Sequence, residues 1–356
     1  MQPIKDIDSL GHSANPLVRQ IQGNCNIADA HSAQEYPLCI YLLKMRDYFR
    51  WHHDLPVNAK PNNQQLGQWI SQKENEWDEM LDKEFEGLKI GSGDYDVFDV
   101  ESINQSLLSQ GLIYGAGFGL GSLPHFFLGS LVRSETINGF EMCVVDTEFA
   151  RDLTAIPAVM QDQKIIIRRD AVLRLVCEKI EEWQWKKQQT AMSRAMDFYP
   201  FEDDFCLALD EMTDEFIETL IMHEVGEAQI GVQLGEQWGV LLQREPGARL
   251  ERMLRATRDL WADCLTTLPG FITGKKLAAI HFYFANFEGF RKQLWPKLYE
   301  SYKHFVKTGS LEKLQDDVEF GMKHWPLLLS EIINQSADSR QKNSDLEAKI
   351  ESFRLT

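Results

Sequence analysis

Residues 213–231 read TDEFIETLIMHEVGEAQIG, and this stretch decides much of the predicted fold. A threonine followed by two acidic residues is a typical helix start, because the hydroxyl caps free backbone N–H groups and the helix N-terminus favours negative charge. Helical spacing then places Phe216, Leu220, His223 and Glu227 on one face, and the apolar pair directs that face inward. We predict a helix from residue 213 to about residue 231.

An inward-facing histidine and carboxylate need compensation, because burying an unpaired charge is costly or forces neutralisation. A bound divalent metal is one form of compensation, since side chains four residues apart on a helix can hold one cation. An arginine is the other, and the nearby candidates are Arg244, Arg255 and Arg258. Both alternatives remain open at the level of sequence.

Several other stretches have apolar residues three and four apart, the pattern of amphipathic helices. They lie at residues 36–51, 64–88, 100–110, 171–196, 249–268, 277–306 and 311–333. We therefore predict an α+β protein that is mainly α. The expected domains are an N-terminal helical lobe at 1–95, a central α/β lobe with the candidate metal site at 96–270, and a C-terminal helical lobe at 271–356.

The predicted strands lie in the central lobe. Residues 141–145 follow the hairpin-like pair Asn138-Gly139, and residues 164–168 form a compact β-branched run. Residues 155–160 could add an edge strand, because Pro157 is tolerated only where no ladder hydrogen bond is needed. We expect a small antiparallel or mixed sheet flanked by helical lobes.

Residues 111–132 contain no charged side chain, and their length alone would suit a membrane-spanning helix. Six glycines, Pro124 and His125 in this window disfavour a continuous helix. The alternating glycines also lack the spacing of a G-x-G-x-x-G dinucleotide loop. We predict a buried or pocket-lining segment and no membrane span.

The chain has 37 basic and 54 acidic residues, a formal net charge of -17. This excess repels phosphate backbones and anionic lipids, so neither nucleic acid nor a membrane is an expected partner. The six cysteines lie far apart and form no C-x-x-C pair, which argues against a zinc finger and a dense disulfide framework. Residues 1–14 show no signal-peptide pattern, and we expect a cytoplasmic location.

The pentapeptide His223-Glu224-Val225-Gly226-Glu227 resembles the H-E-x-x-H helix of zincin metallopeptidases. In that helix two histidines bind zinc and the glutamate between them is the general base. Glu227 replaces the second histidine here and adds negative charge. The resemblance implies His223 and Glu227 as metal ligands and Glu224 as the base.

A second stretch, ATRDLWAD at residues 256–263, resembles the E-x-x-A-[DE] helix of glutamate-type zincins, including the dipeptidyl peptidase III group. Its first acidic residue lies 32 residues beyond Glu227. By position, the resemblance implies Asp259 as the third metal ligand and Asp263 as the outer residue that orients His223.

Together the two motifs resemble a zincin-like core over approximately residues 141–270, with the segment 155–167 as an edge strand for an extended substrate. The implied activity is metal-dependent hydrolysis of a peptide or small amide. Zinc is the expected cofactor, and the two carboxylates shift the preference toward manganese or iron(II). His281 and Tyr283, at the start of the next helix, are candidates for stabilising an oxyanion.

Other interpretations remain open. The protein could be a non-catalytic metal- or ligand-binding or regulatory protein on a zincin-like scaffold, with the aromatic residues of 282–299 lining a groove or an interface between copies. Asp259 and Asp263 could instead form a solvated face paired with Arg255 and Arg258. A di-iron carboxylate bundle is disfavoured, because it needs Glu-x-x-His and none of the histidines has a glutamate three residues before it.

Overall fold

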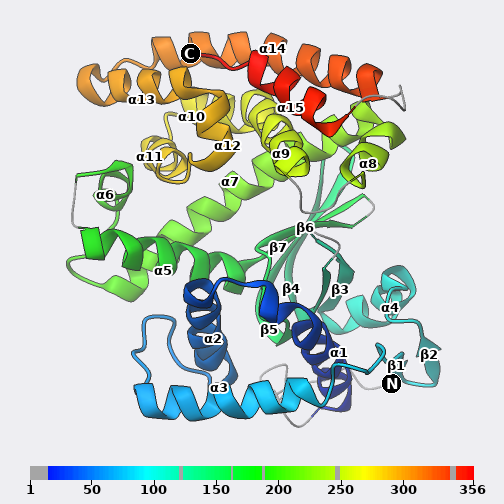
Figure 1. Ribbon diagram of the computed structural model, residues 1–356. Coiled ribbons are helices and arrows are strands. Elements are labelled where there is room, and N and C mark those ends of the chain that lie inside the picture. The colour runs from blue at the N-terminus through cyan, green and yellow to red at the C-terminus, as the bar shows by residue number, and fades with distance from the viewer. Residues whose placement is uncertain (1–14, 120–122, 162, 187–188, 245–248, 337–341) are drawn as a thin grey trace. The chain divides into compact units, whose positions relative to one another are not determined.

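A computed structural model describes residues 15–119, 123–161, 163–186, 189–244, 249–336 and 342–356 (Figure 1). The protein is α+β and mainly α, as predicted. The chain divides into two compact units, one formed by residues 1–136 with 141–178 and the other by residues 137–140 with 179–356. We predicted three lobes instead, with boundaries near residues 95 and 270.

Shared cores explain why the units differ from the predicted lobes. In the first unit, Val18 and Ile21 belong to the same buried cluster as Tyr114 and Phe126, which joins the N-terminal helix to the sheet across position 95. In the second unit, the residues of one buried cluster range from Ala191 to Ile350, and they lie on both sides of position 270. Sequence periodicity finds the helices but not which of them share a core.

Besides the main sheet, the described residues of the first unit form helices and a short hairpin: α1 (Pro16–Ser32), α2 (Leu38–His52), α3 (Asn63–Asp78), α4 (Val100–Leu107), the N-terminal part of α5 (Arg169–Lys186), β1 (Leu88–Ile90) and β2 (Gly93–Tyr95). The predicted helices at 36–51 and 100–110 correspond to α2 and α4. The helix predicted at 64–88 ends ten residues earlier, because residue 88 already pairs with Tyr95 in the hairpin. Helix α1 was not predicted.

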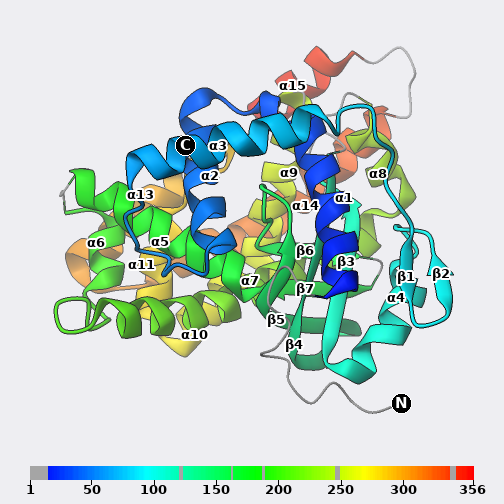
Figure 2. The same cartoon turned by 90° about the horizontal axis from the view of Figure 1, so that it is seen from below.

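Within the described residues, the main sheet has five strands: β3 (Leu112–Phe118), β4 (Pro124–Ile137), β5 (Phe140–Arg151), β6 (Ala158–Gln161) and β7 (Lys164–Arg168). Their order is β3-β4-β5-β7-β6, and β5 runs parallel to β7 whereas β3 with β4 and β6 with β7 are antiparallel (Figure 2). The sheet is therefore mixed. Strand β6 forms one edge, within the segment where we predicted an edge strand.

A tight turn joins β4 to β5. Asn138 and Gly139 both have positive φ angles, 52° and 89°. Two consecutive positive φ values belong to the hairpin turns that match the twist of antiparallel strands, and asparagine and glycine tolerate them best. The hairpin predicted from this dipeptide is confirmed.

The uncharged segment 111–132 forms β3 and β4, with residues 120–122 outside the described part of the chain. Alternate side chains point to opposite faces, so Tyr114 and Phe126 pack with α1 while Ile113 and Phe127 pack on the other face. Both faces are apolar, which hides the alternation that usually reveals a strand. The prediction of a buried segment is confirmed, but the strands were not predicted.

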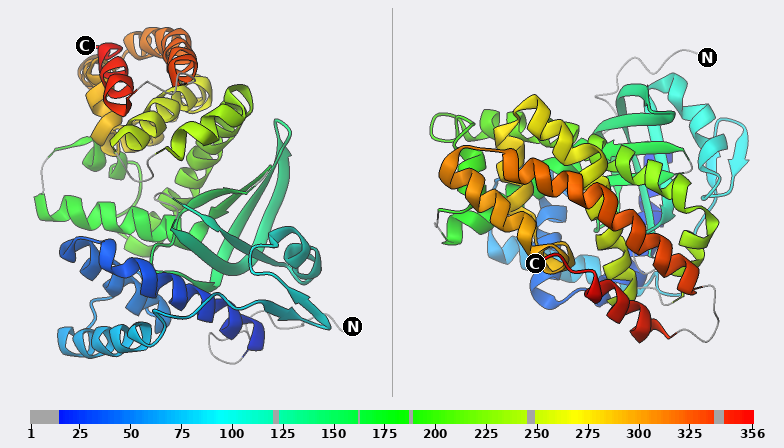
Figure 3. Two further views of the ribbon diagram at one scale, coloured as in Figure 1. Left: turned by 45° about the vertical axis from the view of Figure 1, so that its right-hand side comes forward. Right: turned by 90° about the horizontal axis from the view of Figure 1, so that it is seen from above.

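The second unit is built from the C-terminal part of α5 (Arg169–Lys186) and from α6 (Ala191–Met196), α7 (Phe205–Leu234), α8 (Glu236–Leu242), α9 (Arg249–Ala262), α10 (Leu268–Gly274), α11 (Leu277–Ala285), α12 (Gly289–Leu294), α13 (Pro296–Thr308), α14 (Glu312–Ser336) and α15 (Asn343–Ser352). Helices α13 and α14 lie side by side (Figure 3). Trp295 and Trp325 are fully buried in the core between the helices.

Helix α7 begins eight residues before the predicted start at Thr213. Its cap is Asp204, whose carboxylate accepts hydrogen bonds from the N–H groups of Cys206 and Leu207 at 3.0 and 3.1 Å. The hydroxyl of Thr213 instead donates to the carbonyl of Leu209 inside the helix. A side-chain oxygen of either type can cap a helix, so the earlier start could not be distinguished by residue type alone.

A π-helical turn at Asp263–Thr267 joins α9 to α10. Pro269 therefore falls in the first turn of α10, where a missing N–H costs little, instead of ending the helix as predicted. Such wide turns occur often at functional sites. Within the described residues, each helix is too short or too polar to cross a bilayer.

Candidate metal centre

Helix α7 brings two of the predicted ligands together. His223 and Glu227 are one helical turn apart, and Nε2 of the imidazole lies 3.1 Å from Oε1 of the carboxylate. Both side chains are largely but not fully buried, with 17% and 14% exposure. The helix alone therefore produces half of the site, as its spacing predicted.

Helix α9 and the following π turn supply the other two acidic residues, Asp259 and Asp263. The two helices approach closely at Gly226, where an added methyl group would overlap Thr266 Oγ1 and lie 3.2 Å from the carbonyl oxygen of Ala262. The Thr266 hydroxyl lies across this contact, 2.7 Å from the carbonyl oxygen of residue 222. The glycine in HEVGE is thus what allows the second helix to reach the first.

His223, Glu227 and Asp259 each offer a donor atom, and these atoms lie within 4.8 Å of one another. A single ion with bonds of about 2.0–2.2 Å to nitrogen and oxygen bridges donors up to about 4 Å apart. A small rotation of a carboxylate covers the remaining difference. The residues present therefore fit a divalent cation, and the nitrogen and oxygen donor set suits zinc, manganese or iron(II).

Asp263 contacts the imidazole of His223 on the ring nitrogen that does not face Glu227. Its Oδ1 lies 2.8 Å from Nδ1 of His223, and its Oδ2 accepts hydrogen bonds from the hydroxyl of Tyr283 at 2.7 Å and from Arg291 at 3.3 Å. The carboxylate is 1% exposed. An acidic partner on one ring nitrogen orients the other toward a ligand, so the contact has the geometry predicted for Asp263.

Burial and mutual repulsion raise the pKa of two acidic groups at this site. Burial, with the charge of Glu227, raises the pKa of Asp259 to about 8 and that of Glu224 to about 7. Burial also opposes charge on His223, but Asp263 and Glu227 outweigh it and hold its pKa well above the ordinary value. Without a cation, protons occupy this cluster near neutral pH.

The charged groups of the cluster do not balance. They are the carboxyl groups of Glu224, Glu227, Asp259 and Asp263 and the guanidinium groups of Arg258 and Arg291. Four carboxylates against two guanidiniums leave two negative charges when the imidazole is neutral. A divalent cation supplies the charge that protons otherwise provide.

Arg258 occupies part of the same space. Its guanidinium contacts Oε2 of Glu227 and lies 3.5 Å from Oδ1 of Asp259. Arg258 therefore provides the arginine compensation that the sequence left open, whereas Arg255 pairs with Glu251. Because Asp263 is buried, the interpretation of Asp259 and Asp263 as a solvated pair is wrong for Asp263.

The two residues predicted to stabilise an oxyanion lie differently. Tyr283 donates its hydroxyl to Asp263 and so supports the imidazole indirectly. His281 pairs with the hydroxyl of Tyr302 at 2.9 Å and packs against Phe305, and burial lowers its pKa to about 4. No described contact brings His281 to the cluster, so its catalytic role stays a prediction.

Sequence reasoning missed Arg291 as a site residue and assigned Tyr283 a different role. Both reach Asp263 from α11 and α12, helices whose sequences carry no motif linked to HEVGE. Arg291 also packs over the Tyr283 ring, 5.8 Å from its centre. Tertiary packing alone brings these groups together, and no spacing rule would have found them.

Models of the two domains of one protein family match this chain. The model described as "Family of unknown function (DUF6866) N-terminal domain" matches residues 16–168, and that described as "Family of unknown function (DUF6866) C-terminal domain" matches residues 173–353. Neither the search of curated proteins nor that of solved structures found a match. All the candidate metal ligands lie within the second of the two matched regions.

Proposed function

This protein belongs to the DUF6866 family, and we propose that it is a metal-dependent hydrolase that cleaves a peptide or small amide. His223, Glu227 and Asp259 hold the divalent cation. The observation that carries the proposal is the convergence of these three donors from two helices within 4.8 Å. The buried carboxylate of Asp263 behind the imidazole supports the same assignment.

Glu224 is the general base in this proposal. It neighbours His223 on α7, and its pKa of about 7 allows it to take up and release a proton near neutral pH. When bound, the cation supplies a polarised carbonyl and a water of lowered pKa. Glu224 accepts the proton from the attacking water and returns it to the departing amine.

Zinc is the metal we propose first, with manganese or iron(II) as alternatives. A set of one imidazole and two carboxylates carries more negative charge than the two-histidine set of related helices and suits harder ions better than that set does. We also propose a cytoplasmic location, supported by the six cysteines, which form no disulfide in the described part of the chain and four of which are buried. The acidic charge of the chain supports the expectation that nucleic acid is not a partner.

A second candidate function is a non-catalytic metal- or ligand-binding or regulatory protein on a zincin-like scaffold. The contact between Arg258 and Glu227 favours it, because a guanidinium beside a metal-binding carboxylate competes with the cation. Under this alternative the site holds a weakly bound cation or another ligand, and Glu224 has no chemical role.

Metal analysis combined with hydrolysis assays distinguishes the two functions. The protein, purified without chelator and reloaded with zinc or manganese, should bind one equivalent and cleave members of a peptide and anilide panel. Glu224→Gln should keep the metal but lose about 10²- to 10⁴-fold in kcat, the usual effect of removing a general base. Glu236→Gln, an exposed glutamate of α8, serves as the matched control.

Each other outcome has a defined meaning. Metal bound at His223, Glu227 and Asp259 without hydrolysis by the native protein would favour the regulatory function. Hydrolysis that Glu224→Gln leaves unchanged would contradict the base assignment. If the native protein and His223→Ala bind zinc and manganese equally weakly, the hydrolase function and the proposed metal site are wrong, and a non-catalytic function without a metal is favoured.

A further inference from the structure

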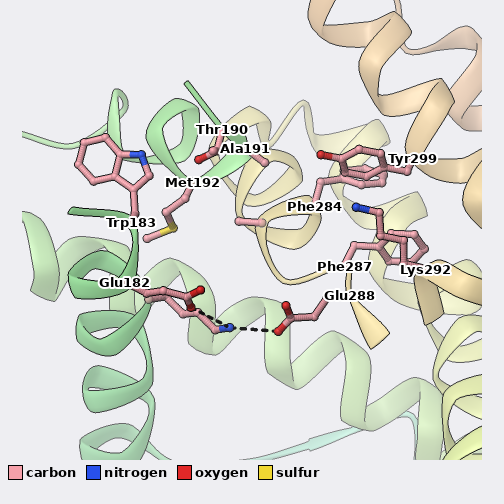
Figure 4. Close-up of a pocket in the computed structure, with 12 residues that line it drawn as sticks. Glu182, Trp183, Thr190, Ala191, Met192, Phe284, Phe287, Glu288, Lys292 and Tyr299 are labelled. Carbon is pink, nitrogen blue, oxygen red and sulfur yellow. Dashed lines mark hydrogen bonds and ion pairs between the residues drawn. The ribbon is translucent and has the colours of Figure 1, made fainter. Parts of the chain in front are cut away.

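Two pockets of the protein differ in the charges that border them. In the second unit, a pocket of about 230 Å³ is bordered by Lys292 and by Lys179, which pairs with Glu288 (Figure 4). Charges of both signs surround it, so charge alone selects no ligand there. In the first unit, a pocket of about 380 Å³ is bordered by two acidic side chains and, within the described residues, by no basic one. Pockets for drug-sized ligands begin at about 300 Å³, so the pocket of the first unit can hold a small organic molecule.

Buried apolar side chains form part of the wall of this pocket, which lies between the last turn of α1, the start of α2 and the C-terminal half of α3. Trp77, Ala30 and Ala33 are 4%, 5% and 8% exposed and belong to one buried cluster. Because the two alanines are small, they leave space beside the indole ring. This wall favours an apolar or aromatic group in the ligand.

Two tyrosines line the same pocket, and the hydroxyl group of each has a partner. The hydroxyl of Tyr36 lies 2.6 Å from Oγ1 of Thr154, and that of Tyr41 donates to Oε1 of Glu74 at 2.9 Å. These bonds restrict the rings, whose electron-rich faces attract cations. Nζ of Lys44 already lies 5.3 Å from the centre of the Tyr36 ring, which leaves the Tyr41 ring for a bound cation.

Two carboxylates of α3 border the pocket without a basic partner. Glu74 and Asp78 are four residues apart, so they lie on the same face of the helix and repel each other. Within the described part of the chain neither forms an ion pair, and the neighbouring Lys73 pairs with Glu76 at 2.7 Å. A cation bound at this edge of the pocket would relieve the repulsion.

We propose that this pocket binds a small organic amine, whose ammonium group meets Glu74 and Asp78 and whose apolar body packs on Trp77. A carboxylate or phosphate ligand would meet two negative charges and no basic side chain among the described lining residues. A metal ion would find only two carboxylates, whereas the group of three donors close enough to hold an ion, among the described residues, is the candidate metal centre. The proposal goes beyond the hydrolase function and does not depend on a metal.

Titration calorimetry with excess chelator tests this binding without any contribution from the metal centre. The probes are phenethylamine, 2-phenylethanol and 3-phenylpropionate, which share a phenyl ring and differ in charge. Because both carboxylates are exposed, phenethylamine should bind only about fivefold to tenfold more tightly than the alcohol, and 3-phenylpropionate should bind more weakly than the alcohol. Raising the salt concentration from about 50 to about 500 mM should remove most of this preference, because salt screens exposed charges. Equal affinity for all three compounds, or no binding of phenethylamine at millimolar concentration, would overturn the proposal.

Neutral variants locate the ammonium group. Glu74→Gln keeps an oxygen for the hydroxyl of Tyr41, and Asp78→Asn keeps the shape of the side chain. Each should weaken phenethylamine about twofold to fivefold and leave 2-phenylethanol unchanged. Glu79→Gln is the matched control, because Glu79 is exposed, loses the same charge and does not line the pocket. If Glu79→Gln weakens phenethylamine as much as the other two variants, or if those two leave its affinity unchanged, the assignment is wrong.

Discussion

Both units bury a cluster of charged side chains, but the clusters are balanced in different ways. In the first unit, Glu148 contacts Nε of Arg168 and accepts a hydrogen bond from Arg174, and Asp47 pairs with Arg174 and with Arg151. Burial raises the pKa of both acids, but the arginines outweigh it and hold each below its ordinary value. Glu148 is 0% exposed.

In the second unit, carboxyl groups outnumber guanidiniums, and the pKa values of Asp259 and Glu224 are raised. The two clusters thus contain the same residue types but differ in their net charge. A cluster with enough arginines is a closed set of ion pairs, whereas one with surplus carboxylates and partial exposure has room for a cation. Burial of charged side chains alone does not identify a functional site. An excess of carboxylates over guanidinium groups is the more useful guide.

The largest expected effect breaks the closed cluster. Glu148→Gln leaves Arg168 and Arg174 buried against a neutral partner, so the free energy of unfolding should fall by about 3 kcal/mol. Urea unfolding measures the loss, with Asp82→Asn at an exposed position as the control. A loss below about 1 kcal/mol would mean that the arginines do not depend on this carboxylate.

The next effect concerns the support of the imidazole. Asp263→Asn keeps an oxygen near His223 but removes the charge that also holds Arg291, so metal affinity should fall about 10- to 100-fold. Titration calorimetry with zinc measures the change against Asp316→Asn, an exposed aspartate of α14. Unchanged affinity would show that Asp263 does not orient the ligand.

The two clusters should also differ in their response to pH. The pKa of Asp259 is raised from 3.8 to about 8 in the folded protein. As pH rises, the unfolded chain therefore loses this proton before the folded protein does, and the free energy of unfolding falls. In chelator, Asp259→Asn should therefore gain about 1 to 2 kcal/mol relative to the native protein between about pH 5 and 8.

The lowered pKa of Glu148 predicts the opposite dependence, in which stability is lost on acidification below its ordinary pKa of 4.5. Urea unfolding of both native and variant proteins at several pH values measures both trends. A difference between Asp259→Asn and the native protein that stays constant with pH would contradict the raised pKa.

The smallest expected effect concerns Arg258. Because its guanidinium contacts Glu227 and lies near Asp259, it competes with a cation, and Arg258→Gln should bind zinc about threefold to tenfold more tightly. Arg255→Gln is the control, since Arg255 pairs with Glu251 on the same helix. Weaker binding by Arg258→Gln would mean that the arginine positions the carboxylates instead of competing for them.

The sequence could predict those parts of the site that follow from local geometry. His223 and Glu227 meet because a helical turn places residues four apart on one face. Asp259 and Asp263 belong to a second motif, and no local rule predicts that this motif contacts the first. Their approach to His223 could be predicted only from the resemblance to a known family. Gly226 explains why α7 and α9 can approach each other, because atoms of the second helix lie where a side chain at position 226 would be.

The remaining parts depend on tertiary packing. Arg291 and Tyr283 reach Asp263 from helices with no related pattern. Helix α1 was not predicted either, although Val18, Ile21 and Cys25 on it are spaced three and four residues apart and are buried. Most of β3 and the first half of β4 escaped prediction because both of their faces are buried there. Hydrophobic periodicity identifies a strand that has one exposed and one buried face. It does not identify a strand whose two faces are both buried.

Anomalous X-ray diffraction at the zinc edge, from crystals of the zinc-loaded protein, tests the central claim most directly. We expect one peak bonded to Nε2 of His223 and to carboxylate oxygens of Glu227 and Asp259, at about 2.0–2.2 Å from each. A zinc-loaded crystal with no peak between these side chains, and with Arg258 still on Glu227, would contradict the account.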